Sequence, residues 1–244
     1  MIKSTEDRLR REKDFHNKTF SSDSRKAVKK YYMSANTSKE FYRSMLLEGI
    51  KAKKVLEYGC GPGSSAFDIA RAGGEVNAID ISDVAIKHTL EKASSYSLQI
   101  SASVMDAENL SFSNDSFDLV CGSGILHQLD LNRSYREIQR VLKKNGKAIF
   151  FEPLGHNPII NLYRYLTPKM RTDDEHPLLM SDLKLAENYF GDVSINYFNF
   201  TSIIGAFFPP IVPFLKHLDE LLFKKLPYLR KYAWIVVIEF SNPK

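Results

Sequence analysis

Glycines and carboxylates are the residues of this 244-residue chain whose spacing best suits ligand binding. Residues 55–63 read V-L-E-Y-G-C-G-P-G, an apolar run followed by glycines at alternate positions. This pattern predicts a buried strand, a tight turn and a helix that begins near Ser64. Because glycine has no Cβ, a ligand can press against the main chain of such a turn, and amide N–H groups would face an anionic group. The segment therefore predicts a nucleotide-binding loop.

Glu57 separates this loop from a dinucleotide-binding loop. Dinucleotide dehydrogenases use G-x-G-x-x-G, with pyrophosphate at the helix end, whereas the spacing here is E-x-G-x-G-x-G. A carboxylate aimed into the loop would repel a pyrophosphate but suit a cationic ligand. The pattern resembles motif I of the class I S-adenosylmethionine-dependent methyltransferases, whose cofactor carries a sulfonium and an ammonium. A glycine-rich turn that binds no ligand is the alternative interpretation.

Two more acidic residues follow expected strands. Residues 75–80 predict a strand ending in Asp80, about twenty residues beyond the loop, where a carboxylate can accept hydrogen bonds from both ribose hydroxyls. A dehydrogenase would use the same position, so Asp80 alone does not separate the two classes. Residues 99–105 predict another strand, and the resemblance implies that Asp106 after it binds the adenine amino group. Capping of the turn is an equal alternative on sequence alone.

Residues 116–129, S-F-D-L-V-C-G-S-G-I-L-H-Q-L, carry the second motif. A buried strand is followed by small residues that let the chain pass close to a ligand. The stretch resembles the fourth motif of the same family, which faces the methionine end of the cofactor and the substrate. Open parallel sheets bind ligands beyond the carboxyl ends of their strands. The complete set of expected cofactor contacts is Glu57, Tyr58, Gly59, Cys60, Gly61, Gly63, Asp80, Ile81, Asp106, Ala107, Gly122 and Ser123.

A histidine is the expected general base if the methyl acceptor is a hydroxyl. Methyl transfer from a sulfonium is an in-line displacement that needs alignment and a dry pocket, and a base within hydrogen-bond reach helps a hydroxyl acceptor. His127, His156 and His176 are candidates, because imidazole can be neutral and basic near pH 7. We expect His127 to be the catalytic residue, since it alone falls in the motif beside the reacting end of the cofactor. A packing or capping role is the alternative for each.

The elements that must position these residues indicate an α/β fold. Strands are expected over residues 75–80, 99–105, 147–153, 192–200 and 233–240, besides those of the two motifs. Helices are expected over residues 64–72, 82–92, 132–142 and 181–189, with Ser82 as an N-cap and Asn145-Gly146 as a terminator. We therefore expect a doubly wound, mostly parallel, seven-stranded Rossmann-like sheet, ending in an antiparallel pair.

The chain is expected to form one methyltransferase domain over residues 1–244, with three parts. Residues 1–50 would be a helical cap, 51–153 the cofactor-binding core, and 154–244 the substrate-side helices, a lid insert and the terminal strands. Family resemblance implies that N-terminal helices fold over cofactor and substrate. The cap residues that could enter a pocket, with ordinary packing as the alternative, are Phe15, His16, Tyr31 and Tyr32. Ser38 is expected to be the N-cap of the helix that contains Phe41 and Met45.

Residues 201–232 form the insert before the last strand. Prolines at 209, 210 and 213 prevent a continuous helix through its apolar first half. Leu215, Leu218, Leu221 and Leu222 would share one side of the helix that follows. Core packing, a lid over an apolar small molecule, and contact with a membrane surface all remain open interpretations.

Charge is uneven along the chain, whose formal net charge is +5. Residues 1–54 hold 15 Lys/Arg against 7 Asp/Glu, so the basic character belongs to the N-terminal arm. Such an arm could contact nucleic acid or an anionic membrane, although its alternating signs favour a solvated helix face. Two cysteines, no zinc spacing and no apolar N-terminal segment predict a reduced, cytoplasmic setting without a secretory signal. The chain has no run of about eighteen apolar residues, so no membrane span is expected.

These observations predict an S-adenosylmethionine-dependent methyltransferase that acts on a small-molecule acceptor at oxygen or carbon, without a metal. One alternative is an RNA methyltransferase that binds its RNA through the basic N-terminal arm. The others are a nicotinamide-dependent oxidoreductase and a cofactor-binding module without turnover.

Overall fold

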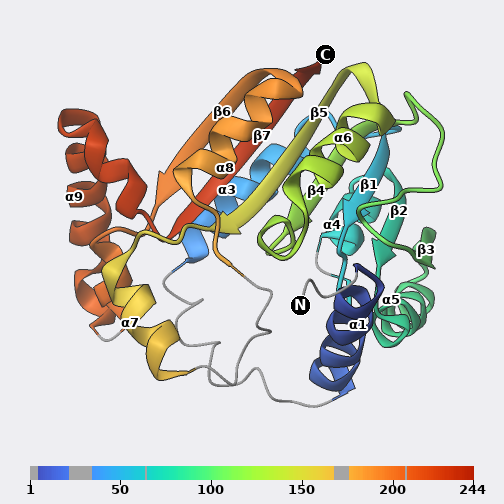
Figure 1. Cartoon of the computed structure of the whole chain (residues 1–244), viewed down its shortest axis with the longest axis horizontal. Coiled ribbons are helices and arrows are strands. Elements are labelled where there is room, and N and C mark those ends of the chain that lie inside the picture. Colours follow the sequence, from blue (N-terminus) through green and yellow to red (C-terminus); the bar gives the residue numbers. More distant parts are fainter. Residues whose placement is uncertain (1–4, 22–34, 64, 168–175, 207) are drawn as a thin grey trace.

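The computed structural model describes residues 5–21, 35–63, 65–167, 176–206 and 208–244 (Figure 1). A seven-stranded sheet with the order β3-β2-β1-β4-β5-β7-β6 runs through its centre. The strands are β1 Lys54–Tyr58, β2 Glu75–Asp80, β3 Ile100–Val104, β4 Phe117–Ser123, β5 Leu142–Pro153, β6 Phe190–Phe198 and β7 Ile235–Pro243. The first five pair in parallel, and β7 lies antiparallel between β5 and β6. The expected fold class and terminal antiparallel pair are thus confirmed.

Helices flank both faces of this sheet (Figure 1). They are α1 Thr5–Ser21, α3 Asn36–Leu47, α4 Ala66–Arg71, α5 Asp83–Ser95, α6 Leu131–Val141, α7 Pro158–Leu166, α8 Met180–Leu185 and α9 Val212–Lys225. Short 3-10 turns join them at η1 Leu126–Gln128, η3 Ala186–Asn188, η4 Ser202–Ala206, η5 Pro209–Ile211 and η6 Pro227–Tyr232. In the part of the chain that is described, no helix is both long and apolar enough to cross a membrane.

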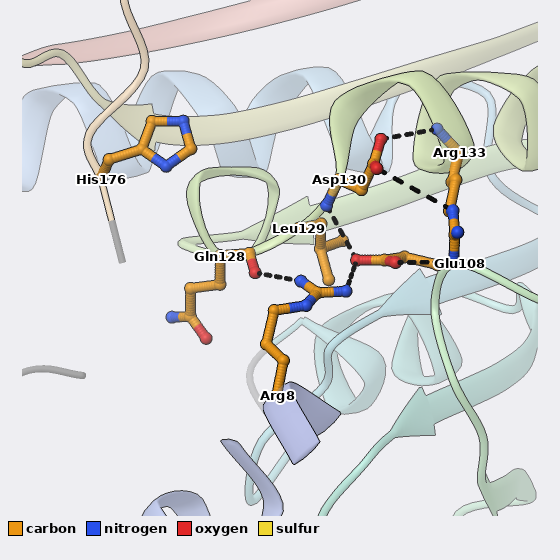
Figure 2. A pocket seen from close by; sticks show the side chains of 7 residues that line it. All are labelled: Arg8, Glu108, Gln128, Leu129, Asp130, Arg133 and His176. Carbon is orange, nitrogen blue, oxygen red and sulfur yellow. Dashed lines mark hydrogen bonds and ion pairs between the residues drawn. The ribbon is translucent and has the colours of Figure 1, made fainter. Parts of the chain in front are cut away.

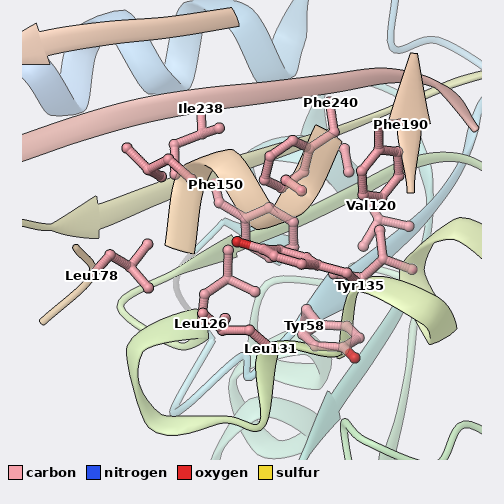
Figure 3. Close-up of a cluster of buried hydrophobic side chains, with 14 of the residues drawn as sticks. Tyr58, Val120, Leu126, Leu131, Tyr135, Phe150, Leu178, Phe190, Ile238 and Phe240 are labelled. Carbon is pink, nitrogen blue, oxygen red and sulfur yellow. The ribbon is translucent and has the colours of Figure 1, made fainter. Parts of the chain in front are cut away.

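The core lies in two layers, one on each face of the sheet. Successive residues of a strand point to opposite faces, so Leu56 enters one layer and its neighbour Val55 the other. Tyr135 of α6 packs in the first layer edge-on to Phe240, at a centroid distance of 5.4 Å (Figure 3). Tyr42 of α3 packs in the second layer. Because the sheet is covered on both faces, β1 is buried continuously from Val55 to Tyr58 rather than at alternate residues.

Several expected helix boundaries differ from the structure. Ser82 is the N-cap of α5, as expected, and its hydroxyl accepts the Ala85 N–H at 3.1 Å. Ser38 is not an N-cap: α3 begins at Asn36, and the Ser38 hydroxyl instead donates to the Ala35 carbonyl at 2.8 Å. The Ser38 hydroxyl in the first turn of α3 therefore donates to a carbonyl and does not cap a free backbone N–H group.

The expected terminator after α6 is also wrong. The helix ends at Val141 and β5 begins at Leu142, so Asn145-Gly146 lies within the first part of the strand. The register between β4 and β5 shifts there, between Phe117 and Leu119. An irregularity in strand pairing therefore takes up the Asn-Gly pair, which in sequence looks like a helix stop.

Candidate active site

The glycine loop after β1 is a tight turn tied to β2. Gly59, Gly61 and Gly63 have φ values of +66°, +52° and +84°, a region that residues with a Cβ rarely adopt. The Gly61 N–H donates to Asp80 Oδ2 at 2.8 Å, and Asp80 Oδ1 accepts the Ser82 N–H at 2.8 Å. The carboxylate of Asp80 thus holds the loops after β1 and β2 together. Because a carboxylate can accept about four hydrogen bonds, these two are compatible with ribose binding.

Glu57 is buried beneath the glycine loop, with 1% of its surface exposed. Its carboxylate accepts the Ser65 N–H at 2.7 Å and the Ala66 N–H at 3.0 Å. These are amides at the start of α4, the groups that bind pyrophosphate in a dinucleotide site. Glu57 therefore places a negative charge where a dinucleotide would need a donor.

The turn after β3 brings Asp106 and Glu108 to the same edge of the sheet. Asp106 is half-buried, and its Oδ1 accepts the Glu108 N–H at 2.8 Å. The Ala107 carbonyl accepts the Tyr58 hydroxyl. Tyr58 itself is fully buried, and desolvation raises the pKa of its phenol well above the ordinary value. Its side chain belongs to the core, so only its backbone is available to a ligand.

The end of β4 passes very close to β1 and β5. A Cβ on Gly122 would lie 2.8 Å from the Tyr58 carbonyl oxygen, so only glycine fits there. The Gly122 carbonyl accepts the Tyr42 hydroxyl at 3.0 Å, which anchors α3 to the strand end. Ser123, the next residue, is exposed. The structure thus brings Gly122 and Ser123 of the second motif to the edge of the sheet where the glycine loop lies.

His127 is paired with Glu152, a carboxylate that is not among the site residues expected from the sequence. His127 Nδ1 lies 2.8 Å from Glu152 Oε2, and the two residues are 7% and 0% exposed. Glu152 Oε1 accepts the N–H groups of Ile125 at 2.8 Å and Leu126 at 2.9 Å. A carboxylate oxygen accepts, so Nδ1 carries the proton and Nε2 is the basic nitrogen of the neutral ring. The position of Glu152 at the carboxyl end of β5 was the only sequence signal for it.

The other two candidate histidines are placed differently. His156 Nε2 accepts the Met180 N–H at 3.4 Å at the start of α8. The His176 backbone N–H donates to the His127 carbonyl at 3.2 Å, and its side chain lines a cavity of about 300 Å³. His156 thus contributes to the docking of α8, and His176 reaches the neighbourhood of His127 mainly through the backbone.

Helix α1 lies across the carboxyl-end loops. Arg8 Nη2 donates to Glu108 Oε1 at 2.5 Å and Arg8 Nη1 to the Gln128 carbonyl at 3.3 Å, which joins the loops after β3 and β4 (Figure 2). Asn17 Nδ2 donates to Asp83 Oδ1 at 3.0 Å beside the loop after β2. At the glycine loop, a Cβ on Gly61 would lie 3.6 Å from the ring of Phe20.

The cap residues named from the sequence divide in two groups. His16 Nε2 lies 2.9 Å from Gln128 Oε1, and Phe15 packs edge-on against the His16 ring at 5.5 Å. Both are half-buried on α1. Tyr31 and Tyr32 lie outside the described residues, as does Ser64.

A sheet of this order with an acidic glycine loop at its carboxyl edge defines the class I methyltransferase fold. Residues 55–146 match the family model described as a methyltransferase domain. The central part of the chain thus matches a methyltransferase domain, and the chain has the class I methyltransferase fold. Among the described residues, no group of three or more His, Cys, Asp or Glu side chains could hold a metal ion.

Curated relatives match about half of the chain. A ubiquinone biosynthesis O-methyltransferase from Alkalilimnicola ehrlichii is 30% identical over 127 residues, which is 51% of this chain and 51% of that protein. A malonyl-[acyl-carrier protein] O-methyltransferase from Herminiimonas arsenicoxydans is 33% identical over 109 residues, 44% of this chain and 40% of that one. The chain therefore spans about half the length of the curated relatives it matches.

Solved structures share the fold over most of the chain. A phosphoethanolamine N-methyltransferase from Haemonchus contortus, in complex with S-adenosyl-L-methionine, has a TM-score of 0.67 at 17% identity and covers 95% of this chain and 60% of that one. The magnesium protoporphyrin IX methyltransferase of Synechocystis PCC 6803 has a TM-score of 0.61 at 14% identity and covers 94% and 97%. At these identities the likeness concerns the fold.

Proposed function

We propose that this protein is an S-adenosylmethionine-dependent methyltransferase that acts on a small molecule, at oxygen or carbon. The burial of the Glu57 carboxylate against the first amides of α4 carries the proposal. Those amides are not available to a pyrophosphate, which disfavours a nicotinamide dinucleotide. The buried negative charge suits a ligand with a sulfonium and an ammonium group. The names of the matched relatives, two of which are O-methyltransferases, support the same class of reaction.

The carboxyl edge of the sheet offers groups that fit this cofactor. Glu57, Asp80 and Asp106 supply carboxylates, and the three loop glycines supply bare main chain. Asp80 would hold the ribose, Asp106 the adenine end, and the loop and Gly122 the methionine end. When bound, S-adenosylmethionine supplies an activated methyl group on a sulfonium. The protein aligns that group with the acceptor and keeps water out.

His127 would accept the proton of a hydroxyl acceptor at Nε2. Glu152 fixes the ring and its tautomer through Nδ1, and the Ile125 and Leu126 amides fix Glu152 in turn. A base held in place before the reaction contributes about 10²- to 10⁴-fold in rate. His127 is thus the group that we expect to touch the acceptor.

The described part of the basic arm does not favour an RNA acceptor. Arg8 pairs with Glu108, Lys13 with Asp83 at 3.1 Å, and Arg43 with Asp68 at 2.7 Å. These charges serve contacts within the protein rather than a cationic face. The segment 26–30 lies outside the described residues. A cytoplasmic location belongs to the same proposal, because Cys60 and Cys121 are free thiols.

Calorimetry with three ligands tests the cofactor. We expect S-adenosylmethionine and S-adenosylhomocysteine to bind and NADH not to bind. Asp80→Ala should weaken S-adenosylmethionine binding by about tenfold or more, since it removes the ribose acceptor and frees the glycine loop. Glu57→Ala should do the same. Glu75→Ala is the matched control, because Glu75 is an exposed carboxylate at the opposite end of β2 from Asp80.

Saturation by NADH without uptake of S-adenosylmethionine would overturn the proposal. Turnover is tested separately by the release of S-adenosylhomocysteine with phenols, quinols and carboxylic acids as acceptors. Binding without release across such a panel would favour the cofactor-binding module without turnover.

A further inference from the structure

Helix α7 carries its apolar residues on the outside. Ile160 faces inward and is 6% exposed. The outward residues are Ile159, Leu162, Tyr165 and Leu166, which are 40%, 60%, 82% and 67% exposed. Their spacing of three and four residues places them along one stripe of the helix. Ordinary surface helices show the reverse arrangement, with polar residues outward, so this stripe needs a partner.

The segment that leads into α9 repeats the arrangement. Phe208, Ile211 and Phe214 follow one another at intervals of three and are 62%, 42% and 69% exposed. The leucines expected on the apolar side of α9 are not its buried residues: Leu215, Leu218 and Leu222 are half-buried and Leu221 is 44% exposed. Asp219 and Phe223 face inward instead. Core packing of the whole insert, one of the interpretations open from the sequence, therefore does not describe these residues.

The two stripes belong to adjoining elements. Ile160 of α7 and Ile203 of η4 lie in the same buried cluster. Asp219 of α9 accepts the Thr201 N–H at 2.7 Å and the Ser202 N–H at 3.2 Å, which fastens α9 to the start of η4. Figure 1 shows α7 and α9 together at one end of the sheet. We call the exposed residues Ile159, Leu162, Tyr165, Leu166, Phe208, Ile211 and Phe214 the α7–α9 apolar surface.

Positive charge accompanies this surface. Residues 202–232 hold five Lys/Arg against two Asp/Glu, and Asp219, one of the two acids, is buried. Residues 158–166 hold Arg164 and no acid. Lys224, Lys225, Arg230 and Lys231 are all exposed at the end of α9 and in η6. Exposed aromatic and aliphatic side chains on elements that also carry exposed lysines and arginines match an anionic lipid headgroup region.

We propose that the α7–α9 apolar surface docks on an anionic lipid bilayer. A second copy of this chain is a less suitable partner for the surface. A two-fold interface would bring the lysines and arginines of α9 and η6 close to the same residues of the other copy. Each exposed apolar side chain would enter the acyl boundary, and the basic residues would contact headgroup phosphates. If the proposed function is correct, docking on this surface favours an amphiphilic acceptor, since α7 begins five residues after Pro153, the end of the strand that carries Glu152.

Vesicle sedimentation of the full chain tests the docking, and it requires no activity. We expect binding to phosphatidylcholine vesicles that contain phosphatidylglycerol, and weaker binding to phosphatidylcholine alone. Tyr165→Ser/Phe214→Ser should lower the partition coefficient on anionic vesicles by about tenfold or more. Lys224→Glu/Lys225→Glu should lower it by a similar factor. Leu90→Ser is the matched control, since Leu90 of α5 is 42% exposed outside the surface.

Circular dichroism checks that each variant is folded. Tyr165→Ser alone is a milder variant, because it changes only one side chain, which is 82% exposed. The proposal is overturned if the wild-type chain stays in the supernatant with both vesicles, or if Tyr165→Ser/Phe214→Ser binds as well as Leu90→Ser. It is also overturned if sedimentation velocity shows a dimer that the double serine variant dissociates while no vesicle binding occurs. In that case a second copy covers the surface. Failure of cofactor binding would leave these outcomes unchanged, so the two proposals fail separately.

Discussion

The pair formed by His127 and Glu152 shows how one buried carboxylate can select the tautomer of a base. Both Glu152 oxygens are engaged, one by two backbone N–H groups and the other by Nδ1 of the imidazole. The backbone contacts come from Ile125 and Leu126, the two residues before His127. The ring and its partner are therefore positioned by the same short turn, which keeps their geometry fixed.

Replacement of Glu152 by glutamine should reverse this tautomer. A glutamine carbonyl can still accept the Ile125 and Leu126 amides, but its NH₂ group donates to Nδ1 and leaves the imidazole proton on Nε2. Nitrogen-15 shifts of the His127 ring should exchange between the wild-type chain and Glu152→Gln. With an acceptor identified, kcat should fall by about 10²- to 10⁴-fold at nearly constant KM. Glu239→Gln, a partly buried carboxylate on β7 paired with Lys147, is the control. Unchanged ring shifts in Glu152→Gln would contradict the assignment.

At this scale the sequence predicted residue types better than it predicted their partners. Glu57 was selected for its charge, but its hydrogen bonds reach the start of α4, and such a contact has no signature in the spacing of the motif. Glu152 was passed over because its partner, His127, lies 25 positions earlier in the chain. Long-range side-chain pairs of this kind depend on how strands are ordered, which a single sequence does not specify locally.

Among the polar contacts that join helix α1 to the sheet edge, the pair of Arg8 with Glu108 involves a buried carboxylate. Glu108 is 6% exposed and accepts both Arg8 Nη2 and, at 2.8 Å, the Asp130 N–H. We expect Arg8→Met to loosen α1 and to raise the hydrogen-exchange rates of its amides about tenfold or more, because it removes the hydrogen bonds to Glu108 and to the Gln128 carbonyl. The buried Glu108 carboxylate then keeps only the more distant Arg133, at 4.0 Å. Arg10→Met, an exposed arginine on the same helix, should have little effect. Equal protection of α1 in both variants would show that the remaining contacts of the helix hold it without Arg8.

The connection from β3 to β4 is tied to α6 by Glu137 and Arg140. Glu137 Oε2 accepts the Leu110 N–H at 2.8 Å, and Arg140 Nη2 donates to the same oxygen at 2.7 Å. The hydrogen bond from Arg140 holds the pKa of Glu137 below its ordinary value. A carboxyl group whose pKa is depressed in the folded state stabilises the fold above its unfolded pKa. That stabilisation is lost as the pH falls through the folded value.

Glu137→Gln should therefore lower the free energy of unfolding at pH 7 by about 1–2 kcal/mol. The difference from the wild-type chain should shrink as the pH falls below about 4.3, the ordinary pKa of a glutamate. Urea titrations at several pH values measure this difference. Glu91→Gln on α5 is the control, because its pair with Lys87 is exposed and worth at most about 0.5 kcal/mol. A difference independent of pH would mean that the side chain acts through packing rather than charge.

Element types were largely predictable, because each strand and helix carries its own periodicity. Helix α6 has its apolar stripe, and the strands of both motifs are apolar runs, so their residues could be placed from the order of amino acids alone. Helix α9 shows the limit. Its leucines predict an apolar inner side, yet Asp219 faces inward because it accepts hydrogen bonds from the turn at Thr201 and Ser202. A long-range polar contact fixed the rotation of the helix.

The whole sheet depends on the last strand of the chain. β7 pairs with β5 on one side and β6 on the other, so Phe240 lies opposite Ala148 and Val193. Phe240 is fully buried and stacks on Phe190 at a centroid distance of 4.9 Å. Phe240 also shares its buried cluster with Leu56 and Tyr58 of β1. Until β7 is in place, β5 and β6 would expose unpaired edges.

Phe240→Ala should thus destabilise the entire molecule rather than its last third. The loss of a buried phenylalanine costs about 3–5 kcal/mol, whereas Leu90→Ala on the exposed side of α5 should change the stability by less than about 0.5 kcal/mol. Trp234, the only tryptophan, precedes β7 and is 5% exposed, so its fluorescence reports on the terminal strands while far-UV circular dichroism reports on all elements. If residues 1–244 fold as one unit, Phe240→Ala shifts both urea transitions to the same lower midpoint. A fluorescence transition that precedes the dichroism transition would instead mean that the terminal strands unfold independently of the glycine-loop core.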